Sequence, residues 1–202
     1  MLKTYLFPLF FLLLFFAACS NNKAILFSQE RLPFLIDSLY QADQSTVNIQ
    51  PPDSAAAEYQ RVIRSNFPYV EKIFNRYGFP GYDLVGEEAS NKYHLLIQHS
   101  DFAPEFQLKV LKSMKKQVSR HNASGQNFAY LTDRVEINHG RPQIYGTQIY
   151  MSGNSQIKPC IDMAHLNERR QSVGLSTIEE YLEKCNETFY LLNPDQKRPD
   201  KN

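Results

Sequence analysis

Two histidines and an aspartate lie close together in the segment HLLIQHSD, residues 94 to 101. On a helix, His94 and His99 would point about 140° apart, because successive residues are rotated by about 100°. One metal ion cannot easily bind both, since ligands on one helix face need a spacing of four residues. We therefore predict no metal site and no bound cofactor. His94, Gln98 and Asp101 do share one side of the helix.

His99 lies on the flank of this helix and allows two interpretations. A histidine among apolar neighbours is most often structural, with its ring nitrogens hydrogen-bonded inside the protein. Alternatively, His99 is a general base that Asp101 or Asp133 orients. Arg134 or Gln148 would then polarise the substrate. This second interpretation describes a hydrolase.

The segment LTDRV places Asp133 and Arg134 next to each other in an otherwise apolar helical pattern. Neighbouring residues on a helix point in different directions, so we expect each to have its own partner. The structural interpretation is a pair of ionic contacts with adjacent helices. The functional one is a carboxylate that orients a base and a guanidinium that grips an anionic ligand.

The segment PQIYGTQIY, residues 142 to 150, combines glutamines, tyrosines and a threonine around one glycine. As a strand it would have two mixed faces, with Gln143, Tyr145 and Thr147 on one and Ile144, Gly146 and Gln148 on the other. A glycine inside a strand often marks a bulge or the close approach of another backbone or a ligand. Buried glutamines also need hydrogen-bond partners. Either Gln143 and Gln148 bind backbone groups at helix ends, or they line a polar cleft.

The N-terminal segment MLKTYLFPLFFLLLFFAAC reads as an export signal, with one early cation (Lys3), an apolar run and small residues before Cys19. The run is too short and too close to the start for a comfortable membrane span of about 20 residues. It resembles the signal of bacterial lipoproteins, in which the cysteine after cleavage carries acyl chains such as palmitate. Two or more chains anchor a protein stably. Because no aspartate follows Cys19, the resemblance favours the outer membrane over the inner membrane.

The net charge argues against one class of partner, and the cysteine content leaves two states for the thiols. Removal of residues 1–18 removes one of the 22 basic residues and none of the 21 acidic ones, so the mature chain is formally neutral. A neutral chain lacks the basic surface that nucleic acids require. In an oxidising compartment Cys160 and Cys185 could form a disulfide; alternatively, both are buried free thiols.

The elements that must position these residues are mostly helices. Apolar periodicity predicts helices over 28–44, 59–77, 87–102, 104–120 and 126–138, with a kink or break at Pro68. From Pro142 the period changes, and runs on both sides of the turn sequence SGNS predict a β-hairpin. Ser176 and Glu179 form a predicted capping box for a C-terminal helix. We predict a compact, mainly α multi-helix domain with one short β-hairpin at about residues 143–161.

The predicted organisation has four parts: a signal peptide (1–18), a lipidated tether (19–27), one helical domain (28–191) and a disordered tail (192–202). Within the domain, YGFP, LVGEEAS, LIQHSD, LTDRV, PQIYGTQ and NERRQSVGL follow in this order. Together they resemble a bacterial domain family of unknown function over residues 77–181. The resemblance implies a helical domain with a short hairpin and no known activity. Its matching polar positions are Gln98, His99, Asp101, Asp133, Arg134, Gln143, Tyr145, Gly146, Thr147, Gln148 and Arg170.

His94 departs from the family pattern, which more often has tryptophan there, and this lowers His94 as a catalytic candidate. We expect an envelope lipoprotein, held to the membrane by acyl chains on Cys19. It would bind an envelope protein or a small ligand in a polar cleft near the hairpin. The predicted ligand-binding residues are Gln98, Arg134, Gln143, Tyr145, Thr147, Gln148 and Arg170. The alternative is a hydrolase of envelope peptide or glycan that uses His99 with Asp101 or Asp133.

Overall fold

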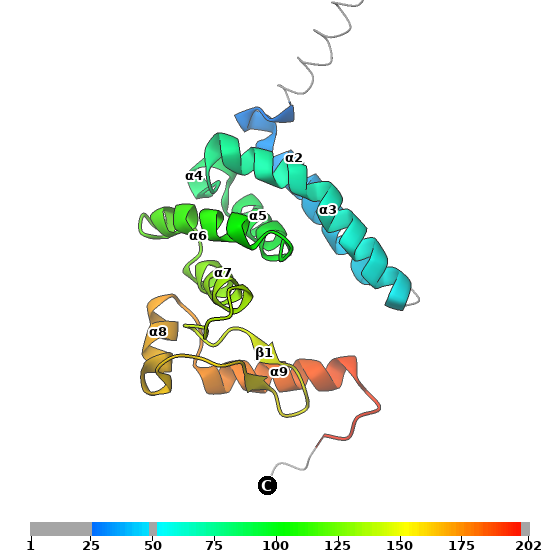
Figure 1. The fold of residues 1–202 in the computed structure, drawn as a ribbon, viewed down its shortest axis with the longest axis vertical. Coiled ribbons are helices and arrows are strands. Elements are labelled where there is room, and N and C mark those ends of the chain that lie inside the picture. Colours follow the sequence, from blue (N-terminus) through cyan, green and yellow to red (C-terminus); the bar gives the residue numbers. More distant parts are fainter. Residues whose placement is uncertain (1–25, 49–51, 199–202) are drawn as a thin grey trace, which may run out of the picture.

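The computed structural model describes residues 26–48 and 52–198. The predicted signal peptide, Cys19, most of the predicted tether and residues 199–202 lie outside this range. Within it, the fold is mainly helical with one two-stranded antiparallel hairpin, as predicted (Figure 1). Phe27, which we assigned to the tether, is buried in the core, and its carbonyl accepts a hydrogen bond from Tyr77. The folded domain therefore includes Phe27.

The N-terminal part contains two helices that pack against each other, α2 (Leu32–Gln44) and α3 (Pro52–Tyr77), with short 3₁₀ turns at Gln29–Arg31 and Ser45–Asn48. Along α2, the apolar residues that recur at helical spacing, Leu32, Leu35, Ile36 and Leu39, are buried.

We predicted a kink or a break at Pro68, and the break is wrong, because α3 continues through Pro68 without interruption. A proline inside a helix removes one backbone hydrogen bond. Ile63, Val70 and Ile73 are buried on both sides of it. Their packing holds the two halves in one helix.

The central helices are α4 (Tyr82–Val85), α5 (Glu87–Gln98), α6 (Pro104–Val118) and α7 (Gly125–Asn138). Helix α5 packs on α2 and on α7, while α6 packs on α7. The apolar and small residues that recur at helical spacing along α5 and just after it are all buried: Ala89, Tyr93, Leu96, Ile97 and Ser100. Ser124 caps α7 by accepting a hydrogen bond from the amide of Asn127.

No helix within the described ranges is long and apolar enough to cross a bilayer.

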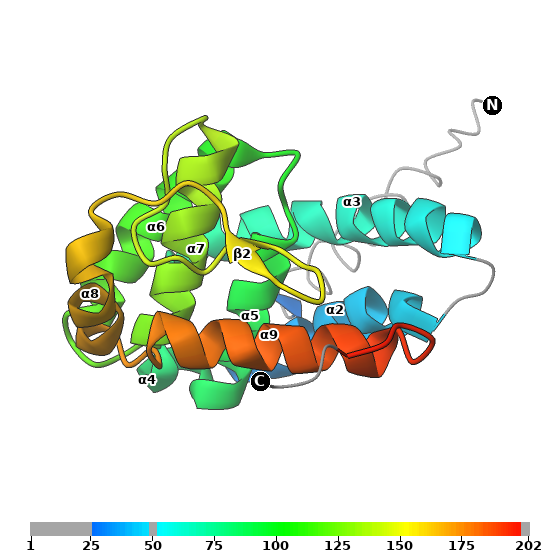
Figure 2. The same ribbon diagram turned by 90° about the horizontal axis from the view of Figure 1, so that it is seen from below.

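The C-terminal part contains the hairpin and α8 (Leu166–Ser172) and α9 (Ile178–Leu192), with a 3₁₀ turn at Met163–His165. Helix α9 runs alongside the hairpin (Figures 1 and 2), where Asn186 and Tyr190 hydrogen-bond to Ser155 and Gly153. The capping box of α9 is formed by Thr177 and Glu180, one residue later than predicted. The sequence offers both registers, since TIEE follows the serine.

The predicted first strand is much shorter than expected. Pairing is confined to β1 (Ile149–Tyr150) and β2 (Gln156–Ile157), with Ile149 opposite Ile157. Gly146 has a positive φ of 68°, and a Cβ there would lie 3.3 Å from Ile178. Residues 143–148 therefore form a tight loop rather than a strand. The two-face pattern predicted for this segment is wrong.

Candidate functional site

Asp133 organises the loop at residues 143–148. Its side chain is fully buried and accepts hydrogen bonds from the amides of Ile144 (2.7 Å), Tyr145 (2.9 Å) and Thr147 (2.8 Å). The Thr147 hydroxyl donates a fourth bond at 2.9 Å. These four donors fix the path of the loop, so Asp133 has a structural role and does not orient His99.

Gln143 and Arg170 complete this loop. The Gln143 side chain donates to the carbonyls of Gln148 and Lys158 and accepts from the amide of Gln148. Arg170 is 1% exposed and donates to the carbonyls of Tyr145 (2.7 Å) and Ser176 (2.7 Å). We predicted that Gln143 binds backbone groups at helix ends or lines a polar cleft. Gln143 does bind backbone groups, but these belong to the hairpin loops and not to helix ends.

Cys160 and Cys185 are both free cysteines in the structure, so no disulfide links them. Burial raises the pKa of both thiols, which keeps them protonated and poorly nucleophilic at neutral pH.

His99 contacts a buried carboxylate that we did not predict. At the C-terminal end of α5, its Nδ1 lies 3.0 Å from both side-chain oxygens of Asp43, in the last turn of α2. Asp43 is 1% exposed, whereas the His99 side chain is 23% exposed. A carboxylate on Nδ1 fixes the ring orientation and leaves Nε2 as the basic nitrogen. The carboxylate that orients His99 is therefore Asp43.

Asp101 has different partners. It accepts hydrogen bonds from Arg134 at 2.9 Å, Asn138 at 3.0 Å and Gln107 at 3.2 Å. Asp133 and Arg134 thus face separate partners, as predicted from their adjacency. The predicted pairing of His99 with Asp101 or Asp133 is wrong, because both carboxylates are occupied elsewhere.

Tyr59 of α3 lies beside the pair of His99 and Asp43. Its ring meets the His99 ring edge-on, with centroids 5.6 Å apart. Burial and the charges of Asp43 and Asp101 raise the pKa of Tyr59 to about 12. Tyr59 therefore stays a neutral phenol that can donate a hydrogen bond near His99.

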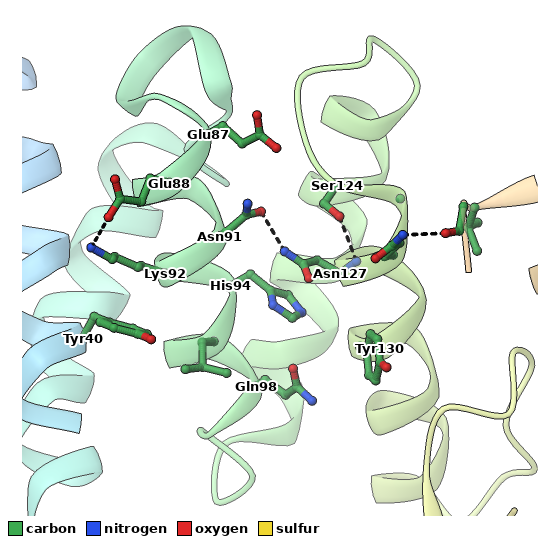
Figure 3. Close-up of a pocket in the computed structure, with 15 residues that line it drawn as sticks. Tyr40, Glu87, Glu88, Asn91, Lys92, His94, Gln98, Ser124, Asn127 and Tyr130 are labelled. Carbon is green, nitrogen blue, oxygen red and sulfur yellow. Dashed lines mark hydrogen bonds and ion pairs between the residues drawn. The ribbon is translucent and has the colours of Figure 1, made fainter. Parts of the chain in front are cut away.

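A groove with a volume of about 870 Å³ lies between α5 and the N-terminal half of α7 (Figure 3). The turn at Val173 and Gly174 forms part of its wall. Its walls carry many carboxamides, aromatic rings and a few charges. The side chains that line it include Tyr40, Glu87, Glu88, Asn91, Lys92, His94, Gln98, Gln126, Asn127 and Tyr130.

His94 points from α5 toward α7 in the middle of this groove (Figure 3). The residue is 4% exposed, and its Nε2 has no hydrogen-bond partner among the described residues. Burial lowers the pKa of His94 to about 4, against a smaller upward influence of the backbone at Asn127. His94 is therefore a neutral imidazole at physiological pH with one polar atom unsatisfied. From sequence we ranked His94 low as a catalytic residue; its position instead makes it a candidate for ligand binding.

A second cavity of about 460 Å³ lies next to the hairpin and α9. It shares Gln126, Tyr130 and Gly174 with the groove, and its wall includes Arg170 and Met151. Of the predicted ligand-binding residues, Gln98 lines the groove and Arg170 lines this second cavity. Arg134 and the four loop residues line neither of the two: Gln143, Tyr145, Thr147 and Gln148.

The residues that we missed come from separate helices. Asp43 and His99 are 56 positions apart, and an aspartate near a helix end gives no local sign of such a contact. Asn91 and Asn127, which bridge the groove walls at 2.8 Å, look like ordinary solvent-facing helix residues in the sequence. Within the described ranges, no group of three or more histidine, cysteine or acidic side chains is arranged to hold a metal ion.

A model of a family of unknown function (DUF6624) matches residues 40–193. This range contains the groove, Asp43 and His99. No curated protein and no solved structure matches the chain.

Proposed function

Because the chain belongs to DUF6624, a family of unknown function, we propose its role from the geometry of its site. The protein is a lipid-anchored component of the bacterial envelope that binds a small polar ligand. The binding site is the groove between α5 and α7, rather than the face of the hairpin itself.

The observation that carries this proposal is the unsatisfied Nε2 of His94. A buried polar atom without a partner costs about 1–3 kcal/mol, so natural proteins keep few of them. Nε2 has almost no surface open to solvent, so a ligand would recover this energy by displacing the lining side chains that cover this atom and hydrogen-bonding to it. The groove volume of about 870 Å³ also falls within the usual size range of small-molecule sites.

The test uses the imidazole of His94 as a reporter. The full chain, labelled with ¹⁵N at histidine, is mixed with the low-molecular-weight fraction of a bacterial envelope extract. We expect the His94 Nε2 resonance to move, because a new hydrogen bond changes its shielding. His121 is exposed on the turn after α6 and serves as the internal control. Unchanged His94 resonances at saturating extract would overturn the proposal.

The envelope location rests on the N-terminal sequence, in which small residues precede Cys19. Replacement of the thiol by a hydroxyl prevents thioether formation, so Cys19→Ser should move the protein from the membrane fraction to the soluble fraction. Cys160→Ser is the matched control, since that cysteine lies in the folded domain. A Cys19→Ser protein that remains in the parent's membrane fraction would refute the anchor.

A second candidate function, a hydrolase of envelope peptide or glycan, is favoured by the contact between Asp43 and His99. With Nδ1–H donated to Asp43, Nε2 of His99 can remove a proton from water. Tyr59 beside it could donate to the developing negative charge.

This candidate predicts release of soluble fragments from purified peptidoglycan. His99→Gln and Asp43→Asn should each lower the rate at least tenfold, because one removes the base and the other its orientation. Asp195→Asn, at an exposed position in the C-terminal tail, should not change it. If the His99→Gln protein releases fragments as fast as the parent, His99 is not the base.

A further inference from the structure

We propose that the ligand of the groove between α5 and α7 is an uncharged saccharide. This inference rests on the proposed function of the groove and names the chemical class of its occupant. It follows from three properties of the walls: the position of their charges, their carboxamides and their tyrosine rings.

The charged side chains that line the groove are one cation, Lys92, and two carboxylates, Glu87 and Glu88. Lys92 bonds to Glu88 at 2.6 Å and to Asp37 of α2, and these bonds raise its pKa. His94 is neutral at physiological pH because of its burial. Glu87 is exposed at the edge of the groove. The inner walls therefore present dipoles, while the excess of negative charge lies on the exposed Glu87 and Glu88, so the groove suits a neutral ligand better than an anion.

Four carboxamides face the groove, Asn91 and Gln98 from α5 and Gln126 and Asn127 from α7. Each has donors and an acceptor in one plane. Asn127 Nδ2 donates to Asn91 Oδ1 at 2.8 Å across the groove (Figure 3). This bond leaves a free amino group on Asn91 and a free carboxamide oxygen on Asn127, at opposite ends of the bonded pair (Figure 3). A sugar hydroxyl both donates and accepts hydrogen bonds, so a hydroxyl can bind at either end of this pair.

Two tyrosines add apolar surface to this polar lining. Tyr40 of α2 and Tyr130 of α7 lie on opposite sides of His94 (Figure 3). An aromatic ring packs well against the C–H face of a sugar ring, while its hydroxyl stays available for hydrogen bonds. Carboxamides, tyrosines and a neutral histidine together form a lining that recognises a molecule with many hydroxyls and no charge.

The experiment measures binding to the full chain in a detergent without a sugar headgroup, since such a headgroup would compete. The probes are triacetylchitotriose, maltotriose, the dipeptide Ala-Ala and inorganic phosphate, followed by calorimetry and by the His94 resonance. We expect a saccharide to bind and to move His94. Gln98→Ala should weaken this binding about tenfold, the loss expected for a good hydrogen bond.

Gln60→Ala is the matched control, because Gln60 is an exposed glutamine of α3 outside the groove, and it should leave binding unchanged. Binding of phosphate or the dipeptide without either saccharide would overturn the inference and leave the groove as a ligand site. If no probe binds but the envelope extract moves His94, only the saccharide class is refuted. If neither the probes nor the extract acts, the inference and the proposed function both fail.

Discussion

Asp133 provides the most demanding test of how this fold is held together. Its carboxylate is completely buried and takes all four of its hydrogen bonds from a single loop, residues 144–147. Asp133→Ala would leave three backbone amides without their acceptor. The loop leads directly into β1 of the hairpin, so the loss of stability should extend beyond the substituted residue.

The size of the effect can be worked out from the individual bonds. An unsatisfied buried amide costs about 1–3 kcal/mol. Because the loop can relax and admit water, the three costs will not add fully, and we expect a total of about 3–5 kcal/mol. Asp133→Asn keeps the shape and one acceptor oxygen, so it should cost about half as much. Thr147→Val removes one bond and should cost about 1 kcal/mol.

The assay is urea unfolding of the parent and the three variants, followed by circular dichroism, with the slope of each transition compared. The order of stability should be parent, Thr147→Val, Asp133→Asn and Asp133→Ala. Typical domains have a free energy of unfolding of about 5–15 kcal/mol, so we expect Asp133→Ala to be close to the limit of folding. A loss below about 1 kcal/mol for Asp133→Ala would refute the reasoning, because the loop would then hold its shape without the carboxylate.

Three further predictions concern other parts of the structure. The pKa of His94 is about 4 when folded and about 6.5 when unfolded, so the unfolded chain binds the extra proton between these values. Stability should therefore fall by about 3 kcal/mol as the pH drops from 6.5 to 4, and His94→Phe should remove this part of the pH dependence in urea titrations. Arg170→Lys should cost about 2 kcal/mol in the same assay, because an ammonium cannot reach both of the carbonyls that the guanidinium contacts; equal midpoints would argue against it. Gly81→Ala should lower the free energy of unfolding by about 1–3 kcal/mol, since the added Cβ would lie 2.8 Å from the Asn122 carbonyl oxygen. A thermal unfolding midpoint equal to that of the parent would show that the backbone around Gly81 can shift to make room.

The helices could be predicted from sequence because their signals are local. The buried positions of α5 and the start of α6 at Pro104 follow from a 3.6-residue period and from proline geometry, and the structure confirms them. The hairpin turn was also found, because SGNS has turn chemistry. These features depend on neighbours a few positions away, and all of those are visible in the chain.

The loop at 143–148 and the partner of His99 could not be predicted in this way. The alternation in QIYGTQ resembles a strand, but Asp133 competes successfully for the amides that a strand would give to its neighbour. Likewise, Asp43 reaches His99 only because α2 packs on α5. Both contacts depend on how helices meet in space, which periodicity does not reveal.

The position of Asp43 also decides which fragment of this chain can be studied. The family match begins at residue 40, inside α2, which starts at Leu32. An expressed fragment cut at that boundary would lack Leu32, Leu35, Ile36 and Leu39, four side chains of the core. It would keep Asp43 on a single frayed turn, with nothing to press that turn against α5. Work on the isolated domain should therefore begin before Phe27, so that the helix behind Asp43 remains whole.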